Sequence, residues 1–107
     1  MVSGFAYHPR LYLGESIKAE KLDKIKRKIE NKPFLSRVFL VSLSRNISDQ
    51  LEIYEAGQLA LGYYRKYPPY IVGIAGDWQE AVSLVVKIAE ECLRVRGDCA
   101  LKEYLGC

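Results

Sequence analysis

Hydrophobic and polar positions divide the chain into strand-like and helix-like segments. Residues 37–43 and 70–75 hold short apolar runs without polar alternation, which is typical of strands covered on both faces. In residues 16–31, 49–66 and 78–96 the apolar positions instead recur every three or four residues, which indicates helices. The pattern therefore predicts two strands, with helices before, between and after them.

Local signals set the ends of the first and third helices. Ser16 is the predicted N-cap of the first helix, and Pro33 stops that helix by residue 31 because it forces the preceding residue toward extended geometry. For the third helix, Asp77 and Glu80 form a D-x-x-E capping box, and Gly97 is the expected left-handed C-cap. A short terminal helix is predicted within residues 98–105.

The second helix, residues 49–66, differs from the other two in its pattern. Its apolar residues are spread over more than half of the helical circumference, so we expect both of its sides to contact protein. Asn46 or Ser48 is the predicted cap at its start. Pro68 and Pro69 follow its end, where they remove backbone donors and clash with the preceding turn.

Strand, helix, strand and helix with short connections make a βαβ pattern, which joins parallel strands by right-handed crossovers. We predict an α/β fold with a small parallel sheet of two or three strands and helices on both faces, in the order βαβα or βαβαβα. The third strand would be residues 11–13. Such a sheet has open edges and faces that must be covered, which predicts a homodimer.

Composition narrows the class of protein. The 107 residues are 50% hydrophobic and 27% charged, with a net charge of +3, which fits one folded domain over residues 1–107 and excludes a disordered chain. No apolar run approaches the ~20 residues of a spanning helix, and no basic segment leads into an apolar one near Met1. We expect a cytoplasmic protein without a membrane segment.

The cysteines and the single histidine give little support for metal or nucleophile chemistry. Cys92, Cys99 and Cys107 form no C-x-x-C pair, so we predict no metal site and no cofactor. Cys99 or Cys107 would need His8 as a base, and that requires the two ends of the chain to meet. We favour a packing or surface role for His8 and free thiols for the cysteines.

A ligand site is predicted at the carboxyl ends of the two strands, where loops lead into helix N-termini that favour anions. Its residues are Arg45, Asn46, Ser48, Asp77 and Trp78, and the loop 14–16 joins them if residues 11–13 form a strand. Arg45 offers a fork for phosphate or carboxylate, and Trp78 could stack on a ring. Helix capping and packing explain the same residues without a ligand, and no nucleotide-binding glycine motif is present.

Four tyrosines surround the two prolines that end the second predicted helix: Tyr63, Tyr64, Tyr67 and Tyr70. Tyrosine and arginine are enriched at the centres of interfaces, which makes these four residues a predicted contact surface. Core packing is the simpler explanation, and stacking on single-stranded bases is the third.

Three functions remain open. The first is a non-catalytic interaction or accessory module that forms a homodimer. The second is a binder of, or an enzyme acting on, a small anionic or phosphorylated metabolite at the strand ends. The third is a weak nucleic-acid binder that uses the basic first helix; the sequence pI of 8.8 makes it less favoured. It requires the lysines to gather on one exposed face without carboxylates between them.

Overall fold

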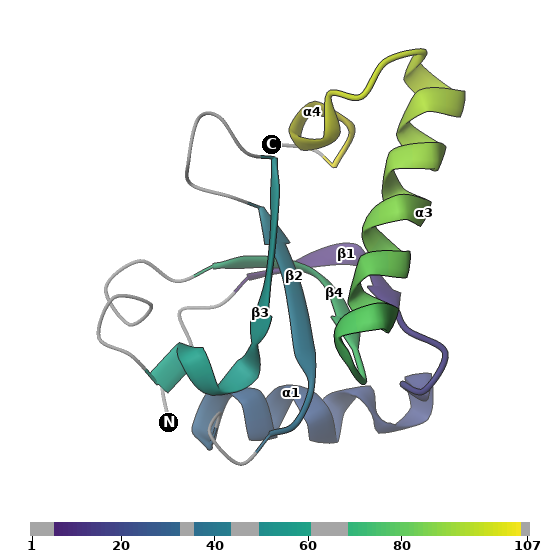
Figure 1. Ribbon diagram of the computed structural model, residues 1–107. Coiled ribbons are helices and arrows are strands. Elements are labelled where there is room, and N and C mark those ends of the chain that lie inside the picture. The colour runs from purple at the N-terminus through teal and green to yellow at the C-terminus, as the bar shows by residue number, and fades with distance from the viewer. Residues whose placement is uncertain (1–5, 33–35, 44–49, 61–68, 106–107) are drawn as a thin grey trace.

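The structure is a computed structural model that describes residues 6–32, 36–43, 50–60 and 69–105 (Figure 1). Its strands are β1 (Ala6–Leu13), β2 (Phe39–Leu43), β3 (Leu51–Glu55) and β4 (Tyr70–Ala75). Its helices are α1 (Leu22–Asn31), α3 (Trp78–Arg96) and α4 (Leu101–Tyr104), with short 3-10 segments η1 (Ala19–Lys21) and η3 (Ala56–Ala60). Among these residues no helix is both long and apolar enough to cross a membrane.

The four strands form one mixed sheet in the order β1-β4-β2-β3. β1 and β4 are parallel, whereas β2 is antiparallel to both of its neighbours. The predicted small parallel sheet of two or three strands is therefore wrong. β2 and β4 are indeed neighbours, but Phe39 at the start of β2 pairs with Ala75 at the end of β4, so the two strands run in opposite directions.

The error arose in the second predicted helix, residues 49–66. Its first described part is β3, which pairs with β2, and η3 follows it directly. Leu51 and Ile53 flank Glu52, a period-two alternation that favours a strand. The wide spread of apolar residues around the supposed helix was the sign that no single helical stripe exists. Residues 61–66 lie outside the described part of the chain.

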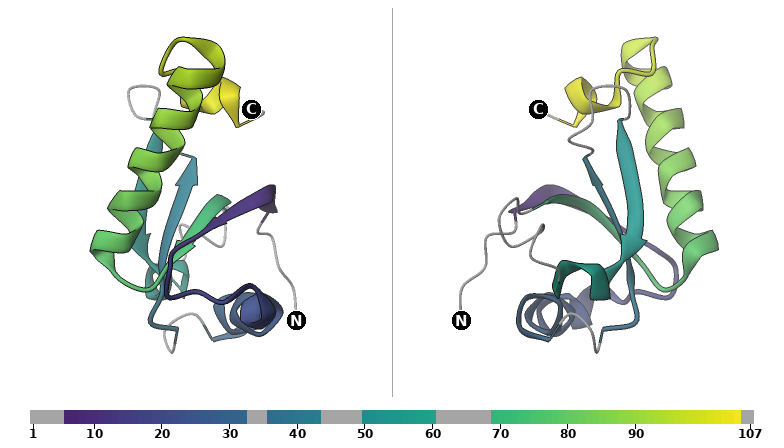
Figure 2. Two further views of the ribbon diagram at one scale, coloured as in Figure 1. Left: turned by 90° about the vertical axis from the view of Figure 1, so that its right-hand side faces the viewer. Right: turned by 60° about the vertical axis from the view of Figure 1, so that its left-hand side comes forward.

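Helices cover both faces of the sheet (Figure 2). On one face, α3 and α4 pack on the core residues Tyr12, Val41 and Val72. On the other face, α1 and η3 pack on a second cluster that includes Leu40, Ile71 and Ile74. These strand residues are all buried, which explains why β2 and β4 show no polar alternation.

The third helix is confirmed over the predicted residues 78–96. Asp77 Oδ1 accepts a hydrogen bond from the Glu80 backbone N–H at 2.8 Å, and Gly97 has φ 83° as the left-handed C-cap. The first helix ends at Asn31 as predicted, but α1 begins at Leu22, and Ser16 is not its cap. The terminal helix is α4 and is shorter than the range 98–105.

β1 spans eight residues, whereas only residues 11–13 were predicted as a strand. Its register with β4 shifts between Tyr7 and Tyr12, so the segment that contains Pro9 bulges out of the ladder. The proline and the bulge explain why the sequence pattern hides the first half of this strand.

Candidate functional site

The loops that follow β1 and β4 meet at the N-terminus of α3, and the carboxylate of Glu80 joins them. Glu80 Oε1 accepts hydrogen bonds from the Gly76 backbone N–H and from the Ser16 hydroxyl, each at 2.8 Å. Glu80 Oε2 accepts one from the Ser16 backbone N–H at 3.3 Å. Because β1 and β4 are parallel neighbours, their carboxyl ends lie at one edge of the sheet, where ligands bind in open α/β sheets.

Two glycines allow these loops to approach so closely. A Cβ at Gly14 would lie 2.0 Å from Glu80 Oε1, and one at Gly76 would lie 2.1 Å from Ser16 Oγ. Both distances are far shorter than van der Waals contact. Any larger residue at either position would displace the Glu80 carboxylate or the Ser16 hydroxyl.

A depression of about 310 Å³ lies beside this junction. Its lining residues are Leu13, Gly14, Glu15, Glu80, Ser83, Leu84 and Lys87. The backbone N–H groups of Gly76 and Glu80 already donate to the carboxylates of Glu80 and Asp77, and two of the lining side chains are acidic. A helix start that binds its own carboxylates is a weak site for an external anion.

The predicted ligand site required β2 and β4 to be parallel, so that the loops after them would meet. The two strands are antiparallel. Asp77 caps α3, and Trp78 is 53% exposed with its ring against Phe39 at a centroid distance of 6.1 Å. Arg45, Asn46 and Ser48 lie outside the described residues. They follow Leu43, which pairs with Leu51 at the sheet end opposite to Ala75. The parallel arrangement that was to bring the two loops together is thus overturned, and ligand binding by these residues stays a prediction.

Of the four tyrosines in the predicted contact surface, the structure describes only Tyr70. It is half-buried at the start of β4, packs against the α3-side core and lies 6.3 Å from the His8 ring. Tyr63, Tyr64 and Tyr67 lie outside the described residues. His8 is itself buried, and its Nδ1 accepts the Arg10 backbone N–H at 3.0 Å, so this histidine has a packing environment.

A second surface feature is an exposed apolar row on α3, which we call the α3 stripe: Trp78, Val82, Val86 and Leu93. These residues project from one flank of the helix, given its 100° rotation per residue. The other flank faces β1, because Glu91 Oε1 accepts a hydrogen bond from the Tyr12 hydroxyl at 2.8 Å. The α3 stripe therefore faces the β2–β3 side, as the contact between Trp78 and Phe39 shows.

β3 is the last strand on that side, and one hydrogen bond fixes the orientation of its backbone. Ala56 donates its N–H to the Val38 carbonyl at 3.0 Å, so residue 56 belongs to a hydrogen-bonded pair with β2. Hydrogen-bonded and non-bonded pairs alternate along an antiparallel ladder. The backbone groups of Leu51, Ile53 and Glu55 consequently point away from β2. No strand in the described part of the chain pairs with this edge.

The two edges of the sheet are protected to different degrees. On β1, Pro9 lacks an N–H and the register is broken, both of which discourage pairing with another chain. β3 pairs with β2 in continuous register from residue 51 to residue 55 and contains no proline. As far as residues 6–32, 36–43, 50–60 and 69–105 show, the edge of β3 is therefore the more open of the two, and it lies on the side of the α3 stripe.

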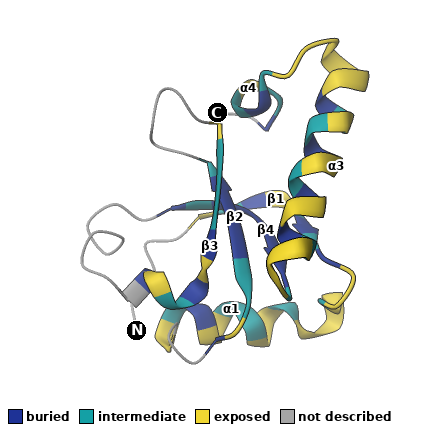
Figure 3. Cartoon of the chain, in the orientation of Figure 1, coloured by how far each residue is buried: buried dark blue, intermediate teal, exposed yellow. Residues whose placement is uncertain are grey.

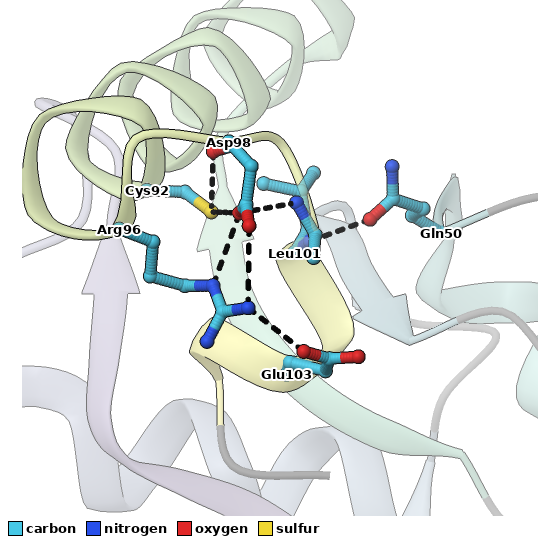
Figure 4. Close-up of polar contacts among 7 residues, drawn as sticks. Gln50, Cys92, Arg96, Asp98, Leu101 and Glu103 are labelled. Atoms are coloured by element: carbon cyan, nitrogen blue, oxygen red, sulfur yellow. Dashed lines mark hydrogen bonds and ion pairs between the residues drawn. The ribbon is translucent and has the colours of Figure 1, made fainter.

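A polar cluster at the α3–α4 corner holds α4 next to the start of β3 (Figure 4). Arg96 pairs with Asp98 at 3.0 Å and with Glu103 at 2.8 Å, and the Gln50 side chain accepts the Leu101 backbone N–H. The hydrogen bonds from Arg96 and from the Ala100 N–H lower the pKa of Asp98.

Two cysteine thiols lie near this corner and are free. Cys92 is buried and donates to the Asp98 carbonyl at 3.2 Å, and burial raises the pKa of its thiol. Cys99 is exposed. Within the described ranges, no three histidine, cysteine, aspartate or glutamate side chains lie close enough together to hold a metal ion.

Comparison of the chain with models of protein families, with curated proteins and with solved structures gave no match. The function must therefore be argued from the fold and its surfaces.

Sequence reasoning missed the α3 stripe and the open edge of β3. The signal for the stripe was the width of the apolar band on the third helix, because that band includes Val82, which is exposed. The open edge of β3 was not recognised because residues 49–66 were predicted to form a helix.

Proposed function

We propose that this chain is a non-catalytic interaction module that forms a homodimer through the edge of β3. The single observation that carries the proposal is the outward backbone of Leu51, Ile53 and Glu55 beside the α3 stripe. An open edge strand is a template for another strand, and exposed apolar side chains next to it gain from being covered.

A second copy of β3 fits this edge. If a two-fold axis passes through Ile53, this residue faces its own copy, and Leu51 faces Glu55 of the partner. Leu51, Ile53 and Glu55 then all form hydrogen-bonded pairs with the partner, because they are every second residue of β3 and their backbone groups point to the same side. The resulting sheet would continue across both protomers and place the partner's Ile53 beneath the α3 stripe, where its side chain adds apolar contact.

The proposal also includes a cytoplasmic location. Free thiols at Cys92 and Cys99 support it, because a reducing compartment keeps cysteines in this state.

The test is the molar mass measured by light scattering after size exclusion, over a range of protein concentrations. We expect a dimer for the wild type and for Ile53→Val, and a folded monomer for Ile53→Pro, because the Ile53 N–H points away from β2 and proline is tolerated at such edge positions. Circular dichroism reports whether each variant folds.

A second pair of variants keeps the test decisive if Ile53→Pro does not fold. Val86→Lys places a charge in the α3 stripe and should weaken the dimer, whereas Ser83→Lys on the polar flank of α3 should leave it intact. A wild type that is monomeric at every concentration, or a dimer that survives both Ile53→Pro and Val86→Lys, would overturn the proposal.

A further inference from the structure

The positive charge of the chain is concentrated on α1 and its flanks. Residues 18–32 contain seven of the 16 lysines and arginines and three of the 13 acidic residues, so this segment carries +4. The remaining nine cationic and ten acidic residues sum to −1, against +3 for the whole chain. The net charge of the protein therefore resides almost entirely in this one segment.

The fold turns these cations outward. Leu22, Ile25 and Ile29 pack α1 on the sheet, so the opposite side of the helix faces solvent. The solvent-exposed part of α1, with Lys21 before it and Lys32 at its C-cap, carries what we call the basic face: Lys21, Lys24, Arg27, Lys28 and Lys32, all exposed (Figure 3). Apart from the adjacent Arg27 and Lys28, successive cations are three or four residues apart, which is about 4.5–6 Å along a helix axis.

Of the nearby carboxylates, Asp23 and Glu30 lie along one flank of the basic face, and Glu20 lies at its N-terminal end, four residues before Lys24. Glu30 accepts a hydrogen bond from the Tyr7 hydroxyl at 2.9 Å, and Lys26 lies 4.5 Å from the centre of the Tyr7 ring. Asp23 lies on the Glu30 flank of α1, and Glu20 belongs to η1 before the helix begins. In the described part of the chain, none of the five side chains of the basic face forms an ion pair with a carboxylate.

We propose that the basic face binds the phosphate backbone of a nucleic-acid duplex without reading its sequence. A row of exposed cations on a rigid helix complements a regular row of phosphates. A membrane surface is the less suitable polyanion, because an amphipathic helix that lies on lipid needs outward apolar side chains. The large exposed apolar residues of the described chain all lie on α3, and the apolar side of α1 is used in the core.

The experiment is fluorescence anisotropy of a labelled DNA duplex titrated with the full chain at several salt concentrations. If four phosphates are contacted, affinity should fall about 150-fold between 50 and 200 mM salt. An RNA duplex of the same length and a DNA duplex of unrelated sequence should bind with similar affinity. Vesicles of phosphatidylserine and phosphatidylcholine should bind more weakly than either duplex.

Matched charge variants assign the binding to the basic face. Lys24→Gln with Lys28→Gln should reduce the salt slope by about 1.8, whereas Lys87→Gln with Arg94→Gln, the same charge change on α3, should leave it unchanged. No duplex binding at low salt, equal losses from both pairs, or binding to vesicles alone would overturn the proposal. The titration is repeated with Ile53→Pro, the variant expected to be monomeric. Duplex binding by this variant would show that the basic face acts independently of the proposed dimer.

Discussion

The Ser16 hydroxyl donates a hydrogen bond to Glu80 Oε1 at 2.8 Å, and this contact joins two loops that are 64 residues apart in the chain. The same carboxylate oxygen accepts the Gly76 N–H, so the ends of β1 and β4 are held together at the start of α3. The first turn of α3 is thereby tied to the loops that follow both parallel strands.

Replacing the Glu80 carboxylate should therefore destabilise the fold. Glu80→Ala removes the acceptor of three hydrogen bonds, and a hydrogen bond to a charged group makes a net contribution of about 1.5–3 kcal/mol when it is well shielded from water. Because the site is partly open to solvent, we expect a total loss of about 1–3 kcal/mol. Urea unfolding measures it, with the exposed Glu90→Ala as the control on the same helix. Equal midpoints for the two variants would contradict the role of the junction.

Gly76→Ala should destabilise the fold for a steric reason, because its Cβ would stand 2.1 Å from Ser16 Oγ. We expect a loss of about 1–3 kcal/mol in the free energy of unfolding. Ser16→Ala removes the clashing oxygen, and Ser16 Cβ would remain 3.3 Å away. The double variant should therefore lose less than the sum of the single variants, which a double-mutant cycle detects. If the losses of the two single variants simply add in the double variant, the methyl group added at position 76 does not clash with Ser16 Oγ.

Trp78 is the single tryptophan of the chain, so its fluorescence reports directly on the α3 stripe. At low protein concentration its half-exposed indole should emit as a hydrated group. As the proposed dimer covers the stripe, emission should shift to shorter wavelength with rising concentration. Ile53→Pro should abolish that shift, and a wild-type spectrum that does not depend on concentration would contradict the proposed interface.

The α3–α4 corner should lose stability in acid. The pKa of Asp98 is lowered below its usual value of 3.8, chiefly by Arg96. A lowered pKa in the folded state means that the unfolded chain binds the proton more tightly, so this contribution is present above about pH 4 and is lost as pH falls through the folded-state pKa. The difference in stability between wild type and Asp98→Asn should therefore be larger at pH 7 than at pH 3. Chemical denaturation at both values measures it, and a difference that does not change with pH would contradict the ion-pair role.

Local chemistry made some elements predictable. Asp77, Glu80 and Gly97 defined the ends of α3, because caps act within a few residues of chain. The unbroken apolar runs at residues 37–43 and 70–75 revealed β2 and β4, because both faces of those strands are buried. The candidate site was less predictable, since Glu80 was recognised only as part of a capping box and not as the link to Ser16.

The sequence by itself determined that this chain folds as an α/β domain with α3, the end of α1 and two buried strands, because periodicity and capping are local properties. Tertiary structure alone decided the strand directions, since the short alternation at residues 51–53 favours a strand but does not specify that this strand pairs with β2. It also decided which surfaces remain exposed. The rotation of α3 about its axis exposes the α3 stripe, and the packing of α1 on the sheet turns the basic face to solvent.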